Sequence, residues 1–390
     1  MTSSAIHANR LAKITTAMQR VYKYPVPDAA ITNTAAAPPK PWTPPPATAG
    51  HRGRYLWTDA FGVLNFLTLH RASIMGSSSG RLDETTTTTT TTSSSSAAAA
   101  YLTYATALAQ AVHDVLGRTR DGSTRLPGAT DADPMGGGLR IGKDDAGGPD
   151  GDGQYHHYLT LWMYALNRLA VAWRGERGGG AEASRWNGHA VRLMQAVHPA
   201  FVYDRDSERP RMYWKVSADL ERPLVLSEGN LDPVDGLVVC KLLREFEGDE
   251  EVLAAETRDY ENIVATKWRN YKSSDPLDLG MTLWTAHQYA GKEQWATGLV
   301  ERAKRDLKVL IDSGYFKAGL RRRLPFREFG TVLGIRCALS SEPSWDTEAE
   351  KVIGIWEDAG VVPEPKDDAP GNSLAPINLV MDLPSVLQNL

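Results

Sequence analysis

The stretch DGDGQYHHYLTLWMYALNRLAVAW, residues 150–173, runs from an acidic, glycine-rich segment directly into a long apolar run. Apolar residues fall on every face of that run, which is typical of a helix that is buried on all sides. Polar side chains gather where the run begins, namely Asp152, Tyr155, His156, His157 and Tyr158. Any active site of the protein is therefore expected to include this junction.

The composition is that of a folded globular protein. Hydrophobic residues make up 42% of the 390 residues and charged residues 23%, so the chain can bury a large core. We expect a single domain over residues 1–390, because all-helical barrels of this length often have one core. The net charge of −4 argues against a nucleic-acid partner, which needs clustered Lys and Arg. The short basic run 321–323 is interpreted as a solvated loop, with an anion-binding patch as the alternative.

The two cysteines and the hydropathy pattern bear on the compartment. Cys240 and Cys337 each lie inside an apolar helical run, as expected for reduced, buried thiols of an intracellular protein. No segment approaches the roughly 20 apolar residues that span a bilayer, and the first residues lack the apolar core of a signal peptide. A cytoplasmic protein without a membrane partner is expected.

The hydrophobic periodicity predicts an all-α chain. Two low-complexity segments interrupt the pattern: a Pro-rich stretch over 25–50, expected to be a surface tether, and a Ser/Thr/Ala tract over 76–100, expected to be a disordered insertion. A short β-hairpin is expected near 211–226. The twelve predicted helices cover 4–22, 55–72, 101–116, 155–174, 182–198, 232–247, 249–270, 276–290, 293–313, 325–341, 344–359 and 373–389.

These helices alternate in character along the chain. Those that begin near 56, 155, 232, 276, 325 and 373 are rich in apolar and small residues, whereas the other six carry charge on one face. An apolar helix is buried and an amphipathic helix has one solvated face. The alternation predicts six inner and six outer helices, paired as six hairpins in an (α/α)6 toroid.

Five segments carry a resemblance to a known superfamily. RYLWTDAF, DGQYHHYLTLW, GNLDPVDGLVV, DPLDLGMTLW and PFREFGTVLG resemble the inner-helix entrances of the six-hairpin glycosidase-like superfamily, which includes many glycoside hydrolases and the N-acylglucosamine 2-epimerase-like isomerases. The resemblance implies that the inner helices enclose a cavity at one rim. It also implies that the N-terminal helix packs as the outer partner of the last inner helix.

Carboxylates stand at four of these helix entrances. DPVD at 232–235 and DPLD at 275–278 each place one Asp at a predicted N-cap, where it satisfies backbone N–H groups, and a second Asp one turn into the helix. We expect the second residues, Asp235 and Asp278, to converge on one cavity with Asp59 and Glu328. Burial and mutual repulsion would raise the pKa of at least one, as glycoside hydrolysis by an acid and a base requires.

The adjacent histidines offer a different chemistry. His156 and His157 are about 100° apart on a helix, so only one of them can face the cavity. A histidine with a near-neutral pKa could move a proton at a sugar carbon, so a sugar isomerase or epimerase using His156 or His157 is the alternative enzyme.

Aromatic and polar side chains near the same entrances are expected to bind the substrate. Trp162 and Trp284 lie two turns into their helices and are expected to pack in the core instead. No metal-ligand spacing occurs, and neither a metal nor a cofactor is expected. The expected substrate-binding residues are Trp57, Asp152, Tyr155, Trp214, Lys215 and Arg327.

Together these features predict a carbohydrate-active enzyme, similar to a glycoside hydrolase, that acts on a small-molecule sugar. Besides the isomerase, two further alternatives are a non-catalytic interaction toroid and an enzyme with a terpenoid-like substrate.

Overall fold

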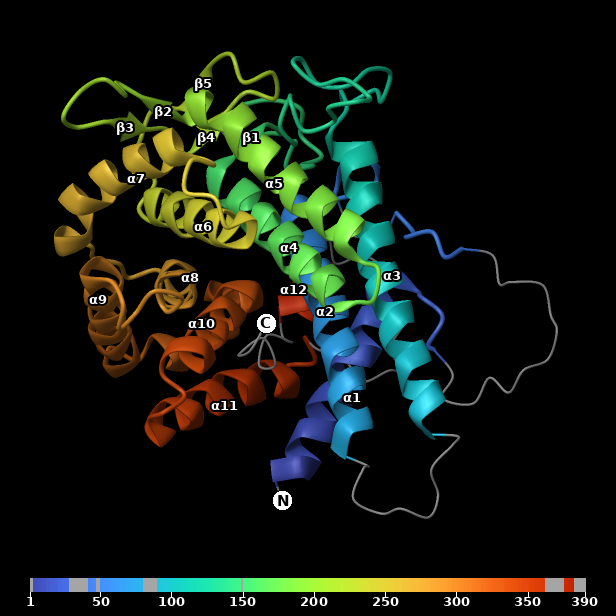
Figure 1. Cartoon of the computed structure of the whole chain (residues 1–390). Helices are drawn as coiled ribbons and strands as arrows, with labels where there is room; N and C mark the ends of the chain where they lie inside the picture. Colours follow the sequence, from blue (N-terminus) through green and yellow to red (C-terminus); the bar gives the residue numbers. More distant parts are fainter. Residues whose placement is uncertain are drawn as a thin grey trace.

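The computed structural model describes residues 3–27, 41–46, 50–79, 90–148, 150–361 and 375–381. This part of the chain is mostly helical, as predicted (Figure 1). Its α-helices are α1 (Ser3–Tyr22), α2 (Leu56–Ser79), α3 (Thr90–Leu116), α4 (His156–Gly175), α5 (Gly180–Phe201), α6 (Asp232–Glu247), α7 (Ala254–Lys267), α8 (Pro276–Ala286), α9 (Gln294–Asp312), α10 (Pro325–Ala338), α11 (Pro343–Asp358) and α12 (Ala375–Met381).

The helices form pairs of neighbours. α3, α5, α7, α9 and α11 each contact the helix that they follow in the chain, and Figure 1 shows them on the outside of those helices. α2, α4, α6, α8, α10 and α12 contact one another in sequence, and α12 contacts α2. α1 packs against both α12 and α2. The cycle of contacts therefore starts and ends at α2.

Burial follows the alternation that the sequence predicts. α2 is buried at every position from Leu56 to His70, whereas α9 buries only one face, which includes Leu299, Ala303 and Leu307. The buried apolar residues form one cluster that draws on all twelve helices, from Ile14 in α1 to Met381 in α12.

Glycines bring the backbones of α8 and α10 into direct contact. A Cβ atom added to Gly280 would lie 2.2 Å from the carbonyl oxygen of Gly330, and one added to Gly334 would lie 2.1 Å from that of Gly280. Both distances are far below van der Waals contact, and both involve backbone, which cannot rotate away. α8 can approach α10 this closely because these positions lack side chains.

We therefore expect Gly280→Ala to lower the free energy of unfolding by about 1–3 kcal/mol, the usual cost of overpacking a core. Gly354→Ala in α11 is the matched control, since a Cβ atom there meets no atom within 4 Å. Replacing a helical glycine without a clash stabilises a protein by about 0.5–1 kcal/mol. Urea denaturation of both variants should give changes of opposite sign, and equal changes would contradict the close packing.

Five short strands lie at one end of the helices, at the top of Figure 1. β4 (Lys215–Val216) pairs antiparallel with β5 (Pro223–Val225), which confirms the expected hairpin. β1 (Gln154–Tyr155) adds to the other edge of β4, so the sheet order is β1-β4-β5. β2 (Val202–Tyr203) pairs with β3 (Arg211–Met212). The three-stranded sheet ties the segment before α4 to the segment before α6.

The two low-complexity segments fall partly outside the described residues. Of the Ser/Thr/Ala tract, residues 76–79 end α2 and residues 90–100 begin α3, so these parts are helical rather than disordered. Alanine has the highest helix propensity, and Ala98 is buried against its neighbours. Of the Pro-rich stretch, residues 25–27 and 41–46 form neither helix nor strand, and Trp42 packs on Phe66.

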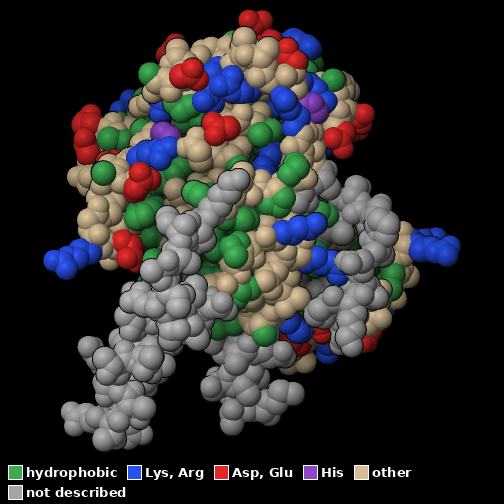
Figure 2. All heavy atoms as spheres, turned by 90° about the vertical axis from the view of Figure 1, so that its right-hand side faces the viewer, with side chains coloured by type: hydrophobic (Ala, Val, Ile, Leu, Met, Phe, Trp, Pro, Cys, Tyr) green, Lys and Arg blue, Asp and Glu red, His purple; other side chains and the backbone are tan. Residues whose placement is uncertain are grey.

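The surface carries mixed charge. Figure 2 shows one face on which basic and acidic side chains are interspersed, rather than one large basic patch. In the described part of the chain, no helix is both long enough and apolar enough to cross a bilayer.

Candidate active site

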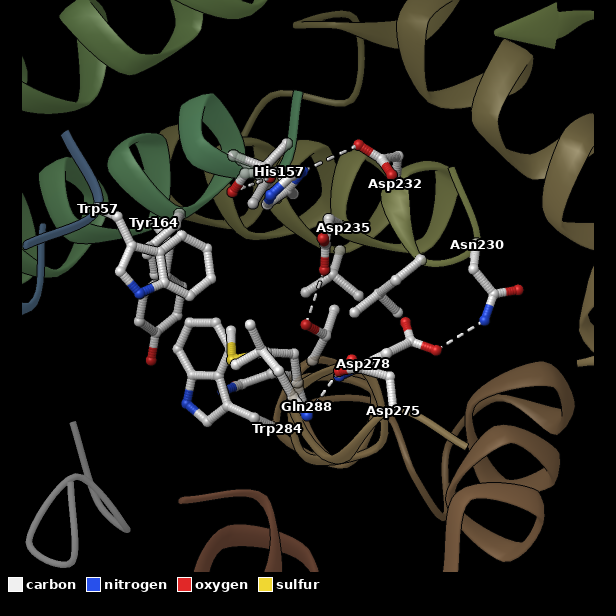
Figure 3. Close-up of a pocket in the computed structure, with 18 residues that line it drawn as sticks. Trp57, His157, Tyr164, Asn230, Asp232, Asp235, Asp275, Asp278, Trp284 and Gln288 are labelled. Atoms are coloured by element: carbon white, nitrogen blue, oxygen red, sulfur yellow. Dashed lines mark hydrogen bonds and ion pairs between the residues drawn. The ribbon is translucent and has the colours of Figure 1, made fainter. Parts of the chain in front are cut away.

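A cavity opens between the N-terminal halves of α4 and α6 and the length of α8, next to Trp57 of α2 (Figure 3). Its volume of about 190 Å³ is many times what one water molecule needs. The lining residues whose side chains have polar groups are Trp57, His157, Thr160, Tyr164, Asn230, Asp232, Asp235, Asp275, Asp278, Trp284, Thr285 and Gln288.

Each helix contributes one face to this cavity. α8 supplies Asp278, Met281 and Thr285, and the turn after it supplies Gln288; these residues follow one another at intervals of three or four. α6 and α4 show the same spacing through their lining residues. Residues at this spacing lie on one side of a helix, so the cavity is formed where three such sides meet.

Asp235 is held one turn into α6 and is buried. The hydroxyl group of Thr285, from α8, donates a hydrogen bond of 2.8 Å to its Oδ1 atom. Burial raises the pKa of Asp235 well above its ordinary value, and the nearby charge of Asp232 adds to the shift. Asp235 is therefore a protonated carboxylic acid over an extended pH range.

Asp278 lines the same cavity from α8 and is more exposed than Asp235. Its Oδ2 atom accepts hydrogen bonds from the Asn230 amide, at 2.8 Å, and from the Tyr271 hydroxyl, at 3.2 Å. Burial raises its pKa, and hydrogen bonds from Ser273, Asn230 and Tyr271 oppose that shift. These donors stabilise the ionised form, so Asp278 loses its proton more readily than Asp235 does.

Asp232 and Asp275 have different local roles, although their sequence motifs match. Asp275 caps α8, because its Oδ1 atom accepts from the backbone N–H groups of Leu277, at 2.9 Å, and Asp278, at 3.1 Å. The expected cap at Asp232 is wrong: Leu231 is the N-cap of α6, and no side chain caps that helix. The carboxylate of Asp232 turns to the two histidines instead.

Of the two histidines, only His157 lines the cavity, as predicted. His157 lines the cavity, and its Nδ1 atom lies 3.5 Å from Oδ1 of Asp232. His156 is buried, and its Nε2 atom lies 2.7 Å from the hydroxyl oxygen of Tyr260 in α7. Burial lowers the pKa of His156 to about 4, so this ring is neutral at physiological pH.

The histidines also set the charge of Asp232. Burial raises the pKa of this carboxyl group, but His157 and His156 together outweigh burial and hold the pKa below its ordinary value. Asp232 and Asp235 lie three residues apart on one helix face, yet their pKa values are shifted in opposite directions. An ionised and a protonated carboxyl group therefore stand side by side.

The aromatic wall of the cavity includes Trp57 and Trp284, which lie near each other on its left-hand side in Figure 3. Trp57, an expected substrate-binding residue, lines the cavity. Trp284 is buried in the core, as expected, and also lines the cavity. Trp162 is fully buried and donates from Nε1 to Nε2 of His113 at 3.0 Å. Trp214 does not line the cavity, because its indole N–H turns to the Ser227 hydroxyl at 3.0 Å.

Asp59 and Glu328 do not reach the cavity, and both are fully buried. Arg323 donates two hydrogen bonds to the carboxylate of Glu328, of 2.7 and 2.5 Å, and the indole N–H of Trp356 donates a third at 2.8 Å. Asp59 lies 3.4 Å from Nη1 of Arg54 and accepts from the Tyr22 hydroxyl at 3.2 Å. The expected convergence of four acids is therefore incorrect for these two, because each is engaged by an arginine.

Three more candidates lie in or next to the three-stranded sheet rather than in the cavity. Arg120 and Arg140 both pair with Asp152, whose Oδ1 atom accepts from the backbone N–H of Gly142 at 3.0 Å. Lys215 is buried, lies 4.4 Å from the centre of the Tyr155 ring and donates to the carbonyl of Gly151 at 2.7 Å. Burial and nearby Lys143 lower the pKa of Lys215 to about 8. Asp152, Tyr155 and Lys215 thus stabilise the junction before α4.

The remaining candidate, Arg327, touches the rim of the cavity. Its Nη1 group forms an ion pair with Oδ2 of Asp275, the atom that does not cap α8. Arg327 itself lines a neighbouring cavity with Arg322 and Tyr315.

Asn230, Tyr164, Gln288 and Trp284 line the cavity but were not among the predicted site residues. The helical spacing from Asp278 could have found Thr285 and the positions beside it, because positions seven apart share a helix face. Asn230 lies before α6, and its contact with α8 has no signal in the local sequence.

In the described residues, no group of three or more His, Cys, Asp or Glu side chains is arranged to hold a metal ion. Comparisons of the chain with protein-family models, curated proteins and solved structures gave no match. Its chemistry is therefore argued from the geometry of this cavity.

Proposed function

We propose that the protein is a carbohydrate-active enzyme, similar in chemistry to a glycoside hydrolase, whose cavity lies in an (α/α)6 toroid. The cycle of contacts from α2 to α12 and back to α2 supports the toroid, as does the outer position of the helices that alternate with them. The observation that carries the function is the pair Asp235 and Asp278, which line one cavity from different helices with unequal tendencies to ionise.

Asp235 is the general acid in this proposal. Glycoside cleavage needs a proton on the leaving oxygen as the bond to the sugar carbon breaks. Asp235 keeps that proton because it is buried and because ionised Asp232 repels a second negative charge. Thr285 donates to one carboxyl oxygen, Oδ1, of this residue, which lines the cavity.

Asp278 is the base or nucleophile. It comes from the opposite helix, and three donors support its ionised form. An ionised carboxylate at this position can stabilise the positive charge that develops on the sugar ring, or can activate water. Trp57 and Trp284 offer apolar faces for the C–H groups of the ring.

The wall chemistry favours a polyhydroxylated ligand over a terpenoid. Asp232, Asp235, Asp275 and Asp278 all reach the cavity, together with Asn230 and Gln288. A hydrocarbon ligand would displace the water that hydrates these groups and could not replace its hydrogen bonds. Each unsatisfied polar group would then cost binding free energy. A sugar ring offers hydroxyl groups that satisfy such partners.

The test is the pH dependence of kcat, measured with a panel of aryl glycosides that release a chromophore. Activity requires ionised Asp278, so it should fall as the pH drops through the pKa of that group. It also requires protonated Asp235, so it should fall as the pH rises through the raised pKa of Asp235. Asp232→Asn removes the repelling charge and should move the basic limb to lower pH, with the acid limb unchanged.

Asp312→Asn is the control for this profile, because Asp312 is an exposed acid at the end of α9. Its profile should match that of the wild type. A basic limb that stays in place in Asp232→Asn would show that Asp232 does not govern the proton on Asp235.

A sugar isomerase is the second candidate, and the position of His157 favours it. His157 lines the cavity beside ionised Asp232, an arrangement suited to proton transfer at a sugar carbon. His157→Asn separates the two: an isomerase loses turnover, whereas a hydrolase keeps it.

A further inference from the structure

A second cavity of about 300 Å³ adjoins the first, and Asp275 forms part of the wall of both. Besides Asp275, its polar lining is Ser274, Tyr315, Arg322 and Arg327. Two arginines against one carboxylate give this cavity a positive charge, next to an acidic one. The two cavities together could hold a ligand longer than one sugar ring.

The arginines of this cavity have hydrogen-bonding capacity to spare. Arg327 uses Nη1 for its ion pair with Asp275, while its buried Nε atom has no hydrogen-bond partner in the described residues. Arg322 has an exposed side chain, and it forms no ion pair or hydrogen bond through its guanidinium within the described ranges. A guanidinium presents N–H groups in a fork that matches an anionic oxygen pair.

The third arginine of the run is engaged elsewhere. Arg323 is buried in its pair with Glu328, so the run at 321–323 is not one solvated patch. Arg321 is exposed and lines neither cavity. Of the three arginines at 321–323, only Arg322 lines the second cavity.

We propose that the second cavity binds an anionic substituent of the substrate, a carboxylate, phosphate or sulfate group, while the sugar ring lies between Asp235 and Asp278. This inference rests on the proposed function and narrows its substrate class to anionic carbohydrates. Asp275 separates the anion from the acid and the base, and Arg327 neutralises Asp275 at that boundary.

Binding of a paired sugar panel tests the proposal, read by the fluorescence of the cavity tryptophans. The probes are glucose, galactose and mannose, each beside its uronic acid, its 6-phosphate and its 6-sulfate. For at least one sugar, an anionic form should bind roughly tenfold more tightly than the neutral form, because hydrogen bonds to charged groups carry that much affinity. The anionic form that binds best identifies the substituent.

Arg322→Gln should remove that preference and leave the affinity for the neutral sugar unchanged. Arg321→Gln is the matched control and should retain the preference. An unchanged melting temperature would show that both variants are folded, as expected for exposed side chains. Equal binding of neutral and anionic forms by the wild type, or equal loss in both variants, would overturn the anion site.

The two proposals fail in different ways. Neutral sugars that bind and are cleaved, without a preference for anions, would leave the hydrolase standing and remove the anion site. Anions that bind through Arg322, with no cleavage of any glycoside, would keep the anion site and remove the hydrolase. A panel in which nothing binds would overturn both.

Discussion

Asp235→Asn is expected to lower kcat by about 10²–10⁴-fold, the usual contribution of a general acid. An amide has the shape of the carboxylic acid but cannot deliver a proton to the leaving oxygen. Asp235 is the group that burial and Asp232 keep protonated, so no neighbouring acid is equally suited to replace it. The measurement is kcat on the best substrate of the aryl glycoside panel, at the pH optimum of the wild type.

The same variant should fold normally. A raised pKa in the folded state means that the stabilisation from Asp235 is complete below the ordinary pKa of Asp and is lost as the pH rises through the folded value. Asparagine cannot ionise, so the variant does not lose this stabilisation as the pH rises. Its amide oxygen can still accept the hydrogen bond from Thr285, so thermal stability near pH 7 should not decrease. Full activity in the variant would remove Asp235 from the mechanism, whereas unfolding would contradict the description of its environment.

Arg323→Met should have the largest effect on stability. Arg323 and Glu328 are both buried and are joined by two hydrogen bonds. Without its partner, the carboxylate of Glu328 would remain as an uncompensated charge in the core, which costs about 3–5 kcal/mol. Urea denaturation should show this loss at pH 7.

Two further variants make the cause clear. Arg321→Met changes the same residue type two positions away, on the surface, and should alter stability by less than about 0.5 kcal/mol. The double variant Arg323→Met/Glu328→Leu removes both charges and should recover most of the loss, because apolar replacements of buried ion pairs are often neutral. A single variant as stable as the surface control would contradict a buried pair.

The helical content and the alternation of buried and half-exposed helices could be predicted from the sequence. Both depend on hydrophobic periodicity, which is a local property with a direct consequence for burial. Helix ends were less predictable. α7 begins at Ala254 rather than near 249, because Leu253 adopts a left-handed conformation, φ 54°, just before it.

The site residues show where a local motif stops being informative. DPVD and DPLD differ at one position, yet Asp275 caps its helix and Asp232 contacts histidines of another helix. The residue before the motif decides this, because Leu231 already has helical backbone angles and serves as the N-cap of α6. Backbone angles of that kind depend on tertiary contacts.

One sequence signal does separate the cavity acids from the structural ones. Arg54 precedes Asp59 by five residues, and Arg323 precedes Glu328 by five, and both arginines pair with those acids. At the same offset, Asp235 follows Asn230 and Asp278 follows Ser273, neither of which carries charge. An acid at a helix entrance with an arginine five residues earlier is therefore better interpreted as a buried ion pair.

The most direct test of the central claim is a crystal structure of the protein soaked with the sugar panel. The proposed function predicts a sugar ring in the cavity against Trp57 and Trp284, with an oxygen of its anomeric carbon within hydrogen-bond distance of the Asp235 carboxyl group. A sugar bound only elsewhere on the molecule, with this cavity empty at saturating concentration, would contradict the assignment of the active site.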